Sequence, residues 1–478
     1  MNFAAAEPNR ALFVDLNEDI YDRHGVYALS ASLKKEGIET SYLCGVKHEP
    51  LIQQIVHQRP RLVMYSSFSH TLNAYRCFDA ELKKHLDVVS VIGGAGATFN
   101  PSYIDSTTIN AACIGEGDHS LPQFIANGFG ATKNIHLSGV TSDCGMLPLV
   151  NLDSLPFPDR DAVYSADPLR AKLPSKQFIS GRGCPYLCTY CFNHTYNNLI
   201  KGHGDIIRKK SVEYLCEEIL SVKSRYSLPM VVFNDDTFIL NRDWLFRFAD
   251  QYPRKVGIPY SCNIRANLVN EEVIRALKES GCVAVNWSIE AGDEPYRNTI
   301  LKRNITDEQI LNSAELLNRY GINHRIGNLI GLPGETNEQI AKTIELNIKA
   351  QATCSLVNIF VPYPGLDLTK YAISAGYCED IPEDELPQNF FSRSAMNITP
   401  KMNSWLKRLV YLFPLFAKYP RLYYNQALNR FLFRLPAIVL RAIYEIFFGV
   451  MFRKLYRVNS SLGTTMQLFW RHLRSLVG

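Results

Sequence analysis

The 478-residue sequence lacks several patterns that would place it in a common class of protein. Met1 to Arg10 contain no apolar segment after a basic start, so we expect no secretory signal there. The 12 cysteines show no paired spacing typical of a disulfide framework, which indicates a reducing, cytoplasmic compartment. Gly93 to Thr98 are rich in glycine but lack the G-x-G-x-x-G order, which excludes a nicotinamide-binding fingerprint there.

Charge is unevenly distributed along the chain. Apolar residues make up 46% and charged residues 20% of the sequence, as in a globular protein with a sizeable core. The length suggests about three domains at ~150 residues each. The net charge is +5, but residues 401–478 hold 13 Lys and Arg against one acidic residue, Glu445. That tail therefore carries +12, and residues 1–400 carry about −7.

Three cysteines form one short run, Cys184, Cys188 and Cys191, within the stretch GRGCPYLCTYCFNH. Three thiolates on one loop can hold three irons of a [4Fe–4S] cluster and leave the fourth iron open to a substrate. A structural zinc site with His194 as fourth ligand is the alternative, but such sites usually use two ligand pairs. The spacing therefore favours a cluster. Other cysteines lie in apolar runs and are expected to be core thiols, among them Cys216, Cys262, Cys282 and Cys354.

Residues 1–145 alternate short apolar runs with helical patterns. Strands are expected at 11–15, 40–44, 61–66, 88–93 and 111–114, with helices at 24–35, 70–85 and 118–126. This order predicts a doubly wound, Rossmann-like α/β domain with a parallel sheet, whose ligands bind beyond the carboxyl ends of the strands. The residues at those ends are Ser66, Ser67, Phe68 and His70, then Gly93, Gly94, Gly96 and Thr98, then Gly115, Glu116 and Gly117.

A second α/β region follows a proline-rich linker at 146–175. Between 176 and 400, six strands are expected at 177–180, 230–234, 259–264, 283–289, 324–330 and 355–361, with helices between them. Thr306 with Gln309, and Thr336 with Gln339, form capping boxes that mark two helix starts. Six strands predict a partial (β/α)6 barrel with its active groups at the carboxyl ends, and the cysteine run follows the first strand.

The cysteine run resembles the motif of the radical SAM superfamily. The resemblance rests on entry through Gly-Cys-Pro and on an aromatic residue, Tyr190, just before the third cysteine. It implies a [4Fe–4S] cluster on Cys184, Cys188 and Cys191 that binds and cleaves S-adenosylmethionine (SAM) to a 5′-deoxyadenosyl radical. It also implies a low-potential electron donor of the flavodoxin or ferredoxin type. The SAM-binding residues implied at the strand ends are Tyr190, Phe192, Asp235, Asp236, Glu290, Arg303, Gly327, Ile330 and Gly331.

The first domain resembles the cobalamin-binding domain of the B12-dependent radical SAM branch. GGAGATFNP and GEGD are similar to loops that border the corrin and its nucleotide tail in that branch. Many B12 domains ligate cobalt with the histidine of D-x-H-x-x-G, but here Gly25 directly follows His24. We therefore expect cobalamin without a histidine below cobalt and with the loop 66–70 covering its lower face. His24 and His70 are the alternative ligands.

Residues 401–478 form a basic, aromatic tail with helices expected at 405–416 and 431–452. Arg434, Arg441 and Glu445 interrupt the second run, which argues against a membrane span because charges at mid-bilayer are costly. An amphipathic helix at the membrane surface and a helical cap on the barrel both fit the pattern. Nucleic-acid binding fits poorly, because long aliphatic runs dilute the arginines. We expect a cytoplasmic protein that can also lie peripherally at the membrane.

Residues 10–400 as a whole resemble a cobalamin-dependent radical SAM enzyme. The resemblance implies methyl transfer from methylcobalamin to an unactivated carbon, or to phosphinate phosphorus, of a small or lipid-like substrate. It requires no catalytic group beyond the cofactor ligands. One alternative is cyclisation or rearrangement without methyl transfer, as in the branch resembling the anaerobic magnesium-porphyrin cyclase. Another is a non-catalytic cobalamin or redox sensor, against which the intact cysteine run argues.

Overall fold

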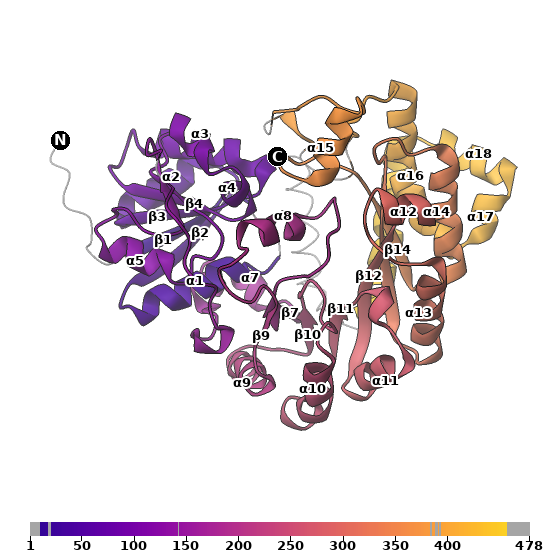
Figure 1. Ribbon diagram of the computed structural model, residues 1–478, viewed down its shortest axis with the longest axis horizontal. Helices are drawn as coiled ribbons and strands as arrows, with labels where there is room; N and C mark the ends of the chain where they lie inside the picture. The colour runs from indigo at the N-terminus through magenta and orange to yellow at the C-terminus, as the bar shows by residue number, and fades with distance from the viewer. Residues whose placement is uncertain are drawn as a thin grey trace.

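Two six-stranded sheets form the frame of the protein, one after the other along the chain (Figure 1). The structure is a computed structural model that describes residues 10–17, 21–141, 143–382, 385–387, 391 and 393–456. The last part of the predicted tail, 457–478, lies outside the described residues. The division into two α/β units followed by helices is the fold class that the sequence predicts.

The first sheet has the order β2-β1-β3-β4-β5-β6. Its strands are β1 (Arg10–Asp15), β2 (Glu39–Cys44), β3 (Leu62–Ser66), β4 (Val89–Gly93), β5 (Ala111–Cys113) and β6 (Ile135–Leu137). The first five are parallel, as predicted. The short strand β6 runs antiparallel to β5 and is an addition to the predicted pattern.

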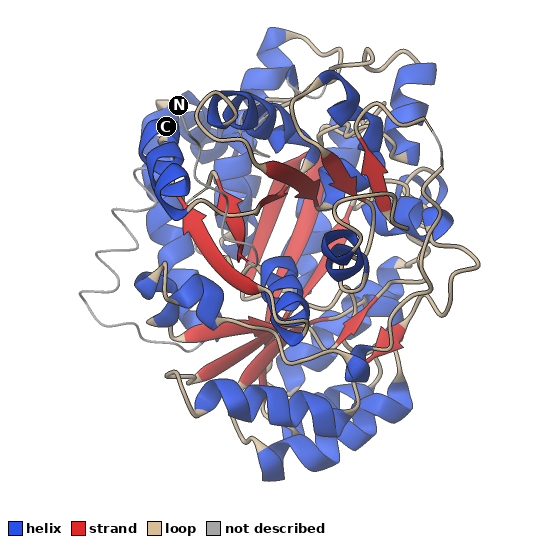
Figure 2. Cartoon of the chain, turned by 90° about the vertical axis from the view of Figure 1, so that its left-hand side faces the viewer, coloured by secondary structure: helices blue, strands red, loops and turns tan. Residues whose placement is uncertain are grey.

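Helices cover both faces of this sheet. Figure 2 shows helices on either side of the strands. Alternate side chains of β1 explain why: Phe13 packs on one face with α1 and α5, whereas Leu12 and Val14 pack on the other with α2 and α3. The helices are α1 (His24–Lys35), α2 (His48–Gln58), α3 (Leu72–Leu82), α4 (Ala95–Phe99) and α5 (Ser120–Ala126). The domain is thus doubly wound, and α2 is a helix that the sequence pattern does not reveal.

The predicted linker packs between the two domains through a few buried side chains, Arg160 and Arg170 among them. It contains the short elements η3 (Leu152–Ser154), α6 (Asp161–Tyr164) and α7 (Pro168–Ala171). The buried guanidinium of Arg160 lies over the rings of Tyr27 and Phe178, at 5.1 and 4.3 Å. Asp22 accepts hydrogen bonds from the Tyr27 hydroxyl at 2.6 Å and from the Gln177 amide at 2.7 Å. This network fixes the first domain against the first strand of the second.

The second sheet has the order β14-β13-β12-β11-β10-β7, and all its pairs are parallel. Its strands are β7 (Ser175–Phe178), β10 (Met230–Phe233), β11 (Tyr260–Asn263), β12 (Cys282–Glu290), β13 (Asn323–Ile330) and β14 (Cys354–Ile359). The helices around it are α9 (Val212–Lys223), α10 (Arg242–Lys255), α11 (Glu271–Glu279), α12 (Glu294–Thr299), α13 (Asp307–Arg319), α14 (Asn337–Ala350) and α15 (Asp367–Ser374). The predicted partial barrel is confirmed.

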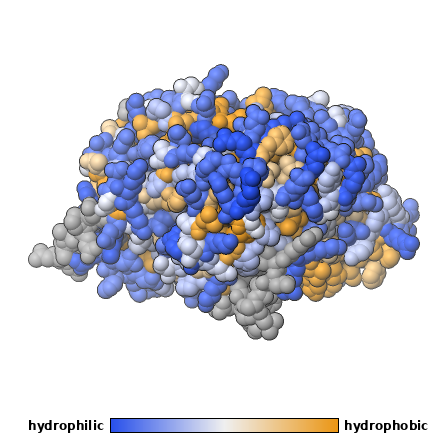
Figure 3. All heavy atoms as spheres, turned by 90° about the horizontal axis from the view of Figure 1, so that it is seen from below, coloured by the Kyte–Doolittle hydropathy of each residue, from blue (hydrophilic) through white to orange (hydrophobic). Residues whose placement is uncertain are grey.

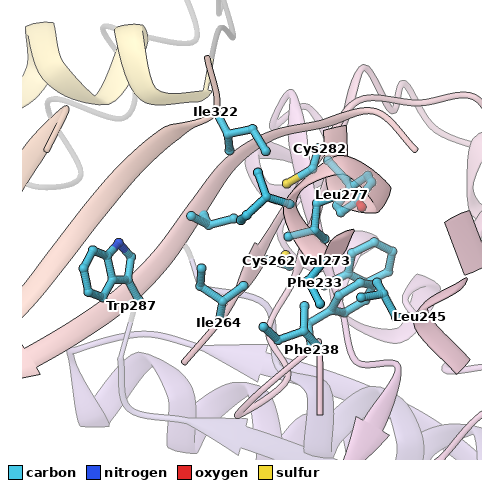
Figure 4. Close-up of a cluster of buried hydrophobic side chains, with 14 of the residues drawn as sticks. Phe233, Phe238, Leu245, Cys262, Ile264, Val273, Leu277, Cys282, Trp287 and Ile322 are labelled. Atoms are coloured by element: carbon cyan, nitrogen blue, oxygen red, sulfur yellow. The ribbon is translucent and has the colours of Figure 1, made fainter. Parts of the chain in front are cut away.

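The barrel core is aromatic and aliphatic, and it holds three of the predicted core thiols, Cys216, Cys262 and Cys282, the last two of which are labelled in Figure 4. Both predicted capping boxes are formed: Thr306 accepts a hydrogen bond from the Gln309 amide, and Thr336 accepts one from the Gln339 amide. These local signals mark where α13 and α14 begin. The barrel therefore presents the carboxyl ends of its six strands at one edge.

The C-terminal region contains α16 (Pro400–Lys418), α17 (Pro420–Tyr424), α18 (Gln426–Arg434) and α19 (Ala437–Tyr456). Helix α16 buries Leu406, Leu409 and Phe413 against Ile330 and Ile359 of the barrel, so this part of the tail is a helical cap. The predicted helix at 431–452 is divided into α18 and α19. No single described helix is long and apolar enough to span a membrane; α18 and α19 pass that test only as a pair, which is bent by 110°.

Candidate cofactor and substrate site

The carboxyl edges of the two sheets face each other. Helix α8 (Phe192–Leu199) follows the cysteine run, and its first residue, Phe192, stacks on Phe99 of α4 with ring centroids 4.9 Å apart. Tyr363, in the loop after β14, lies 5.7 Å from the Phe192 ring and 6.2 Å from His70, which follows β3. Loops from both domains thus meet beside the cysteine run, as the rule for parallel sheets predicts.

The cysteine loop lies between the short strand β8 (Gly181–Arg182) and α8. Gly183 has φ +98, and a Cβ there would lie 2.0 Å from the Ile206 carbonyl oxygen, so only glycine fits this turn. Burial raises the pKa of Cys184 and raises that of Cys191 to about 12. Both are therefore thiols unless a cation compensates the thiolates, which is what an iron–sulfur cluster provides.

The same cysteines do not form a site for one metal ion. Within the described ranges, no group of three or more His, Cys, Asp or Glu side chains is placed to hold a single metal. His194, the proposed fourth zinc ligand, instead pairs through Nε2 with Asp367 at 2.9 Å. A cubane cluster differs from zinc because its ligands bind separate irons and lie further apart. The arrangement therefore fits a cluster better than zinc.

Two adjacent carboxylates after β10 have different environments. Asp235 is buried, and it accepts hydrogen bonds from the Ser180 amide at 3.0 Å and from Lys209 Nζ at 2.8 Å. Asp236 faces a cavity and receives a hydrogen bond from Asn193, the second residue after Cys191. Desolvation raises the pKa of Asp236, so this carboxylate would gain from a cationic partner. Asp235 is a structural group, and Asp236 is the one open to a ligand.

Three other predicted SAM-binding residues form one network. Tyr190 donates a hydrogen bond to Glu290 at 3.2 Å, and it accepts one from Arg303 at 2.5 Å. Arg303 also donates to the Ser288 carbonyl and lies 3.8 Å from Glu290. Glu290 has φ +69, an unusual conformation for a residue other than glycine at the end of β12. The structure therefore brings the aromatic residue of the cysteine loop and the end of the fourth barrel strand together.

The predicted SAM-binding residues at the end of β13 differ in what they can offer a ligand. Ile330 is fully buried against α16 and β14, so its side chain belongs to the core between barrel and cap. Gly327 packs on Ser288 of β12, where a Cβ would lie 3.3 Å from that of the serine. Gly331 has φ +68. The backbone at this strand end, rather than the Ile330 side chain, is what the site can offer a ligand.

Hydrogen bonds and close backbone contacts join the glycine-rich loops of the first domain to one another. Ser67 donates through Oγ to the Gly93 carbonyl at 2.9 Å, and Thr98 accepts through Oγ1 from the Gly115 amide at 3.0 Å. Gly94 has φ +90, and a Cβ there would lie 2.5 Å from the Ser67 carbonyl oxygen. A Cβ on Gly96 would lie 2.8 Å from the Phe68 backbone. Small residues are therefore required for these loops to close on one another.

A cavity of about 460 Å³ extends from these loops to the barrel. It is mostly apolar, because its floor is the face of the first sheet between α1 and α5. Residues lining the floor and walls include Phe13, Met64, Val91, Gly93, Gly115 and Gly117, and the barrel side includes Gly183, Asn193 and Asp236. A long cleft with small residues at one end and the cysteine loop at the other fits a large cofactor held between the domains.

Glu116, predicted in the cobalamin loop, also joins the domains. Its carboxylate pairs with Arg208 of β9 (Arg208–Lys209) at 2.5 Å and with Arg182 of β8 at 3.1 Å. Arg182 reaches Asp118 as well, at 2.8 Å. Because Arg182 lies two residues before Cys184, these ion pairs fix the cysteine loop against the glycine-rich loops of the first domain.

The two candidate histidine ligands lie in different places. His24 begins α1, as predicted, and lines the cavity; its Nε2 is buried without a hydrogen-bond partner in the part of the chain that the structure describes. Burial, with Arg160 and Lys210 nearby, lowers the pKa of His24 to about 4, so the imidazole is neutral at pH 7. His70 stacks in parallel on Phe68 at 5.9 Å and does not line that cavity.

Several residues at the site were not predicted from the sequence. Arg265 contacts Cys188, Arg182 binds the GEGD loop, and Phe99 and Tyr363 complete the aromatic contact between the domains. Arg265 directly follows the third predicted barrel strand, and Tyr363 is the second residue after the sixth. Attention to every residue just beyond a strand end would have included both of them.

Comparisons with known proteins agree with this arrangement. The sequence model of the B12 binding domain matches residues 10–125, and that of the Radical SAM superfamily matches residues 178–346. An uncharacterized methyltransferase of Pyrococcus horikoshii is 28% identical over 317 residues, 62% of this chain and 66% of that protein. Cytidylyl-2-hydroxyethylphosphonate methyltransferase of Streptomyces wedmorensis is 21% identical over 359 residues, 65% of this chain and 66% of that protein.

The fold also matches a solved structure. The cobalamin-dependent S-adenosylmethionine radical enzyme OxsB, with aqua-cobalamin and S-adenosylmethionine bound, aligns with a TM-score of 0.68 at 15% identity. The alignment covers 98% of this chain and 75% of that one. At this identity the likeness concerns the fold. The chain spans about two-thirds of the length of the curated relatives described above.

Proposed function

We propose that this chain, which belongs to the radical SAM superfamily and carries a B12-binding domain, is a cobalamin-dependent methyltransferase. The observation that carries the proposal is the facing of the two carboxyl edges, with one cavity reaching from the glycine loops of the first domain to Asp236 beside the cysteine loop. Two related proteins named as methyltransferases, one of them acting on a phosphonate, support the reaction type.

The proposed cofactors are divided between the domains. Cys184, Cys188 and Cys191 would hold a [4Fe–4S] cluster, and the loops after β3, β4 and β5 would hold cobalamin. When bound, the cluster with SAM supplies one-electron chemistry and cobalamin supplies the methyl group. The reaction needs a low-potential one-electron donor, which we propose to be of the flavodoxin or ferredoxin type.

In the proposed reaction, the side chains and backbone of the protein bind and orient SAM and shield the substrate from water. We propose that Asp236 accepts hydrogen bonds from the SAM ammonium, because both adjacent carboxylates line the cavity but Asp235 is buried and paired with Lys209, whereas Asp236 is exposed. The backbone at Gly327 and Gly331 would pack on the adenine, whereas Tyr190 is held by Glu290 and Arg303. Phe99, Phe192 and Tyr363 cover the meeting point of the two domains and would exclude water from a small-molecule substrate there.

Product analysis of the anaerobically reconstituted protein tests this function. Iron, sulfide, cobalamin, SAM, a low-potential reductant and a lysate extract as the source of substrates would be supplied. Near-equal, extract-dependent amounts of 5′-deoxyadenosine and S-adenosylhomocysteine are expected. Deoxyadenosine without S-adenosylhomocysteine would replace methyl transfer by cyclisation or rearrangement. If the protein binds cobalamin but forms neither product, the sensor hypothesis replaces both.

We also propose that the C-terminal helices contact an anionic membrane surface. Phe431 of α18 is 61% exposed, and Ile438 and Ile446 of α19 are 78% and 71% exposed. Apolar atoms gather at the lower right of Figure 3, toward the side of the molecule where α17 and α18 lie in Figure 1. Arg434 and Arg441 lie on the same two helices, so an apolar surface is accompanied by positive charge. Anionic lipid headgroups beside acyl chains complement both features.

Sedimentation with vesicles tests this contact. The full chain is expected to bind phosphatidylglycerol-containing vesicles more tightly than pure phosphatidylcholine vesicles, with weaker binding at high salt. An I438S/I446S variant should lose most of the binding, whereas L220S, which changes an exposed apolar residue on α9, should keep it. Point variants are required because deleting 401–478 would remove α16 from the core. Equal binding by all variants, or dimerisation through the patch instead of vesicle binding, would contradict the proposal.

A further inference from the structure

Arg265 lies at the carboxyl end of the third barrel strand, between β11 and the 3-10 turn η4 (Ala266–Leu268). It is only 5% exposed. Its Nη1 is 3.7 Å from Sγ of Cys188, and its guanidinium carbon lies 3.7 Å from the centre of the Tyr186 ring. Both partners belong to the cysteine loop, so one side chain holds the middle of that loop from two sides.

The same guanidinium also reaches the fourth strand end. Its Nη2 donates a hydrogen bond to the Arg303 carbonyl oxygen. Arginine suits this position because its planar fork can stack on a ring and donate in two directions at once, whereas lysine offers a single point charge. Arg265 therefore links the cysteine loop to the segment that carries the Tyr190–Glu290–Arg303 network.

The charge of Arg265 has no matching carboxylate. Other buried arginines have one: Arg160 lies 3.4 Å from Asp22, Arg297 lies 2.7 Å from Asp307, and Arg303 lies 3.8 Å from Glu290. Across the described residues, no salt bridge to an acidic side chain is formed by Arg265, and its buried Nε has no hydrogen-bond partner. A buried cation without an anion is costly. A group that can become anionic, the Cys188 sulfur, lies 3.7 Å from Nη1 of Arg265.

We propose that Arg265 is a positioning residue whose missing counter-charge is the thiolate-ligated cluster. The inference rests on the proposed function, because it requires a cluster on Cys188. A cation and an N–H donor beside a ligating sulfur stabilise the more negative, reduced state of an iron–sulfur cluster. Arg265 thereby raises the reduction potential of the cluster and keeps Cys188 oriented toward it.

Redox titration of the reconstituted protein tests this assignment. R265Q is expected to bind iron but to require a more reducing potential for half-reduction, with an altered EPR spectrum of the reduced cluster. R265K, which keeps the charge but loses the fork, should shift in the same direction by less. R297K changes a buried arginine elsewhere in the barrel and should keep the potential and spectrum of the parent.

A parent-like potential and spectrum in iron-loaded R265Q would overturn the proposal. If R265Q does not retain iron, R265K decides: a lowered potential supports the role, and an unchanged potential refutes it. Failure of this inference is distinguishable from failure of the proposed function. In the first case the parent protein still binds a cluster and forms both products, whereas in the second it does not form them.

Discussion

At the carboxyl edge of the first sheet, the proposed binding groups are backbone and small side chains; at the edge of the second, they are charged side chains. Gly94 and Gly96 lie where a Cβ would collide with the neighbouring loop. In the barrel, by contrast, Asp236, Arg265 and Arg303 stand at three different strand ends beside the cysteine loop. The two edges have the same parallel geometry and opposite chemistry.

The difference teaches how one fold principle serves two kinds of ligand. A large cofactor held along its length needs close approach, which glycine allows and a side chain prevents. A small charged ligand on a metal cluster needs oriented charges, which only buried and hydrogen-bonded side chains can hold in place. Substitutions at the first edge should therefore weaken ligand binding through steric clashes, and substitutions at the second edge should weaken it through lost charges.

The largest effect is expected from C188A at the second edge. Removing one of three ligands should abolish the cluster, and with it all cleavage of SAM, because SAM needs the open iron of an intact cluster. Iron content and 5′-deoxyadenosine formation measure this. C216A, which removes a buried core thiol of α9, should retain both. Normal iron content in C188A would contradict the proposed ligand set.

G94A should weaken cobalamin binding at the first edge through a steric clash, without any change of charge. A methyl group there would lie 2.5 Å from the Ser67 carbonyl oxygen, at a φ of +90 that side chains rarely adopt. We expect cobalamin binding, followed by its absorbance, to weaken at least about tenfold, since strain of this kind costs about 1–3 kcal/mol. Iron loading should be unchanged. G449A, at a site with open space in α19, is the control and should bind cobalamin like the parent.

D235N and D236N should distinguish the carboxylate that stabilises the barrel from the carboxylate that binds SAM at the second edge. D236N should fold normally but bind SAM roughly 10- to 100-fold more weakly, since a hydrogen bond to a charged group contributes about 1.5–3 kcal/mol. D235N leaves the buried Lys209 unpaired and should lower the free energy of unfolding by about 3–5 kcal/mol. SAM titration and chemical denaturation measure the two effects. The reverse pattern would assign the roles the other way round.

H24Q should give the smallest effect at neutral pH, because its effect is confined to acidic pH. The pKa of His24 is about 4 in the folded protein against about 6.5 when unfolded, because burial disfavours the imidazolium. Between these values the unfolded state binds the extra proton, so stability is lost as the pH falls from 6.5 toward 4. Chemical denaturation at pH 7 and pH 5 should show a loss in the parent that H24Q reduces by about 2 kcal/mol. An equal loss in both proteins would show that His24 is not the titrating group.

The barrel strands were predictable because parallel strands buried on both faces produce continuous apolar runs. The expected ranges 177–180 and 355–361 correspond to β7 and β14 with shifts of one or two residues at most ends. β6 escaped prediction because three residues are too few to show a period. The run at 431–452 was read as one helix, and Pro436 between α18 and α19 accounts for the break.

The site was predictable only where its parts are close in sequence. Cys184, Cys188 and Cys191 share one loop, so their spacing alone indicates a shared ligand. Asp235 and Asp236 are adjacent residues of the same type, and no local sequence pattern indicates which of them is buried and paired with Lys209. Glu116 is predicted as a cofactor contact from its own loop, whereas its pairing with Arg208, 92 residues away, depends on the packing of two domains and could not be predicted.

The sequence by itself determined the cysteine run, the order of strands and helices, and the strand ends at which ligands can bind, because these follow from spacing and periodicity along a few residues. The tertiary structure alone decided which of the two adjacent carboxylates is buried and paired with Lys209, which arginine lacks a counter-charge, and how the glycine loops meet the cysteine loop. Arg265 and Cys188 are 77 residues apart, and only the curvature of the barrel brings them into contact. Burial and long-range pairing set the charge of each group, and neither is a property of local sequence.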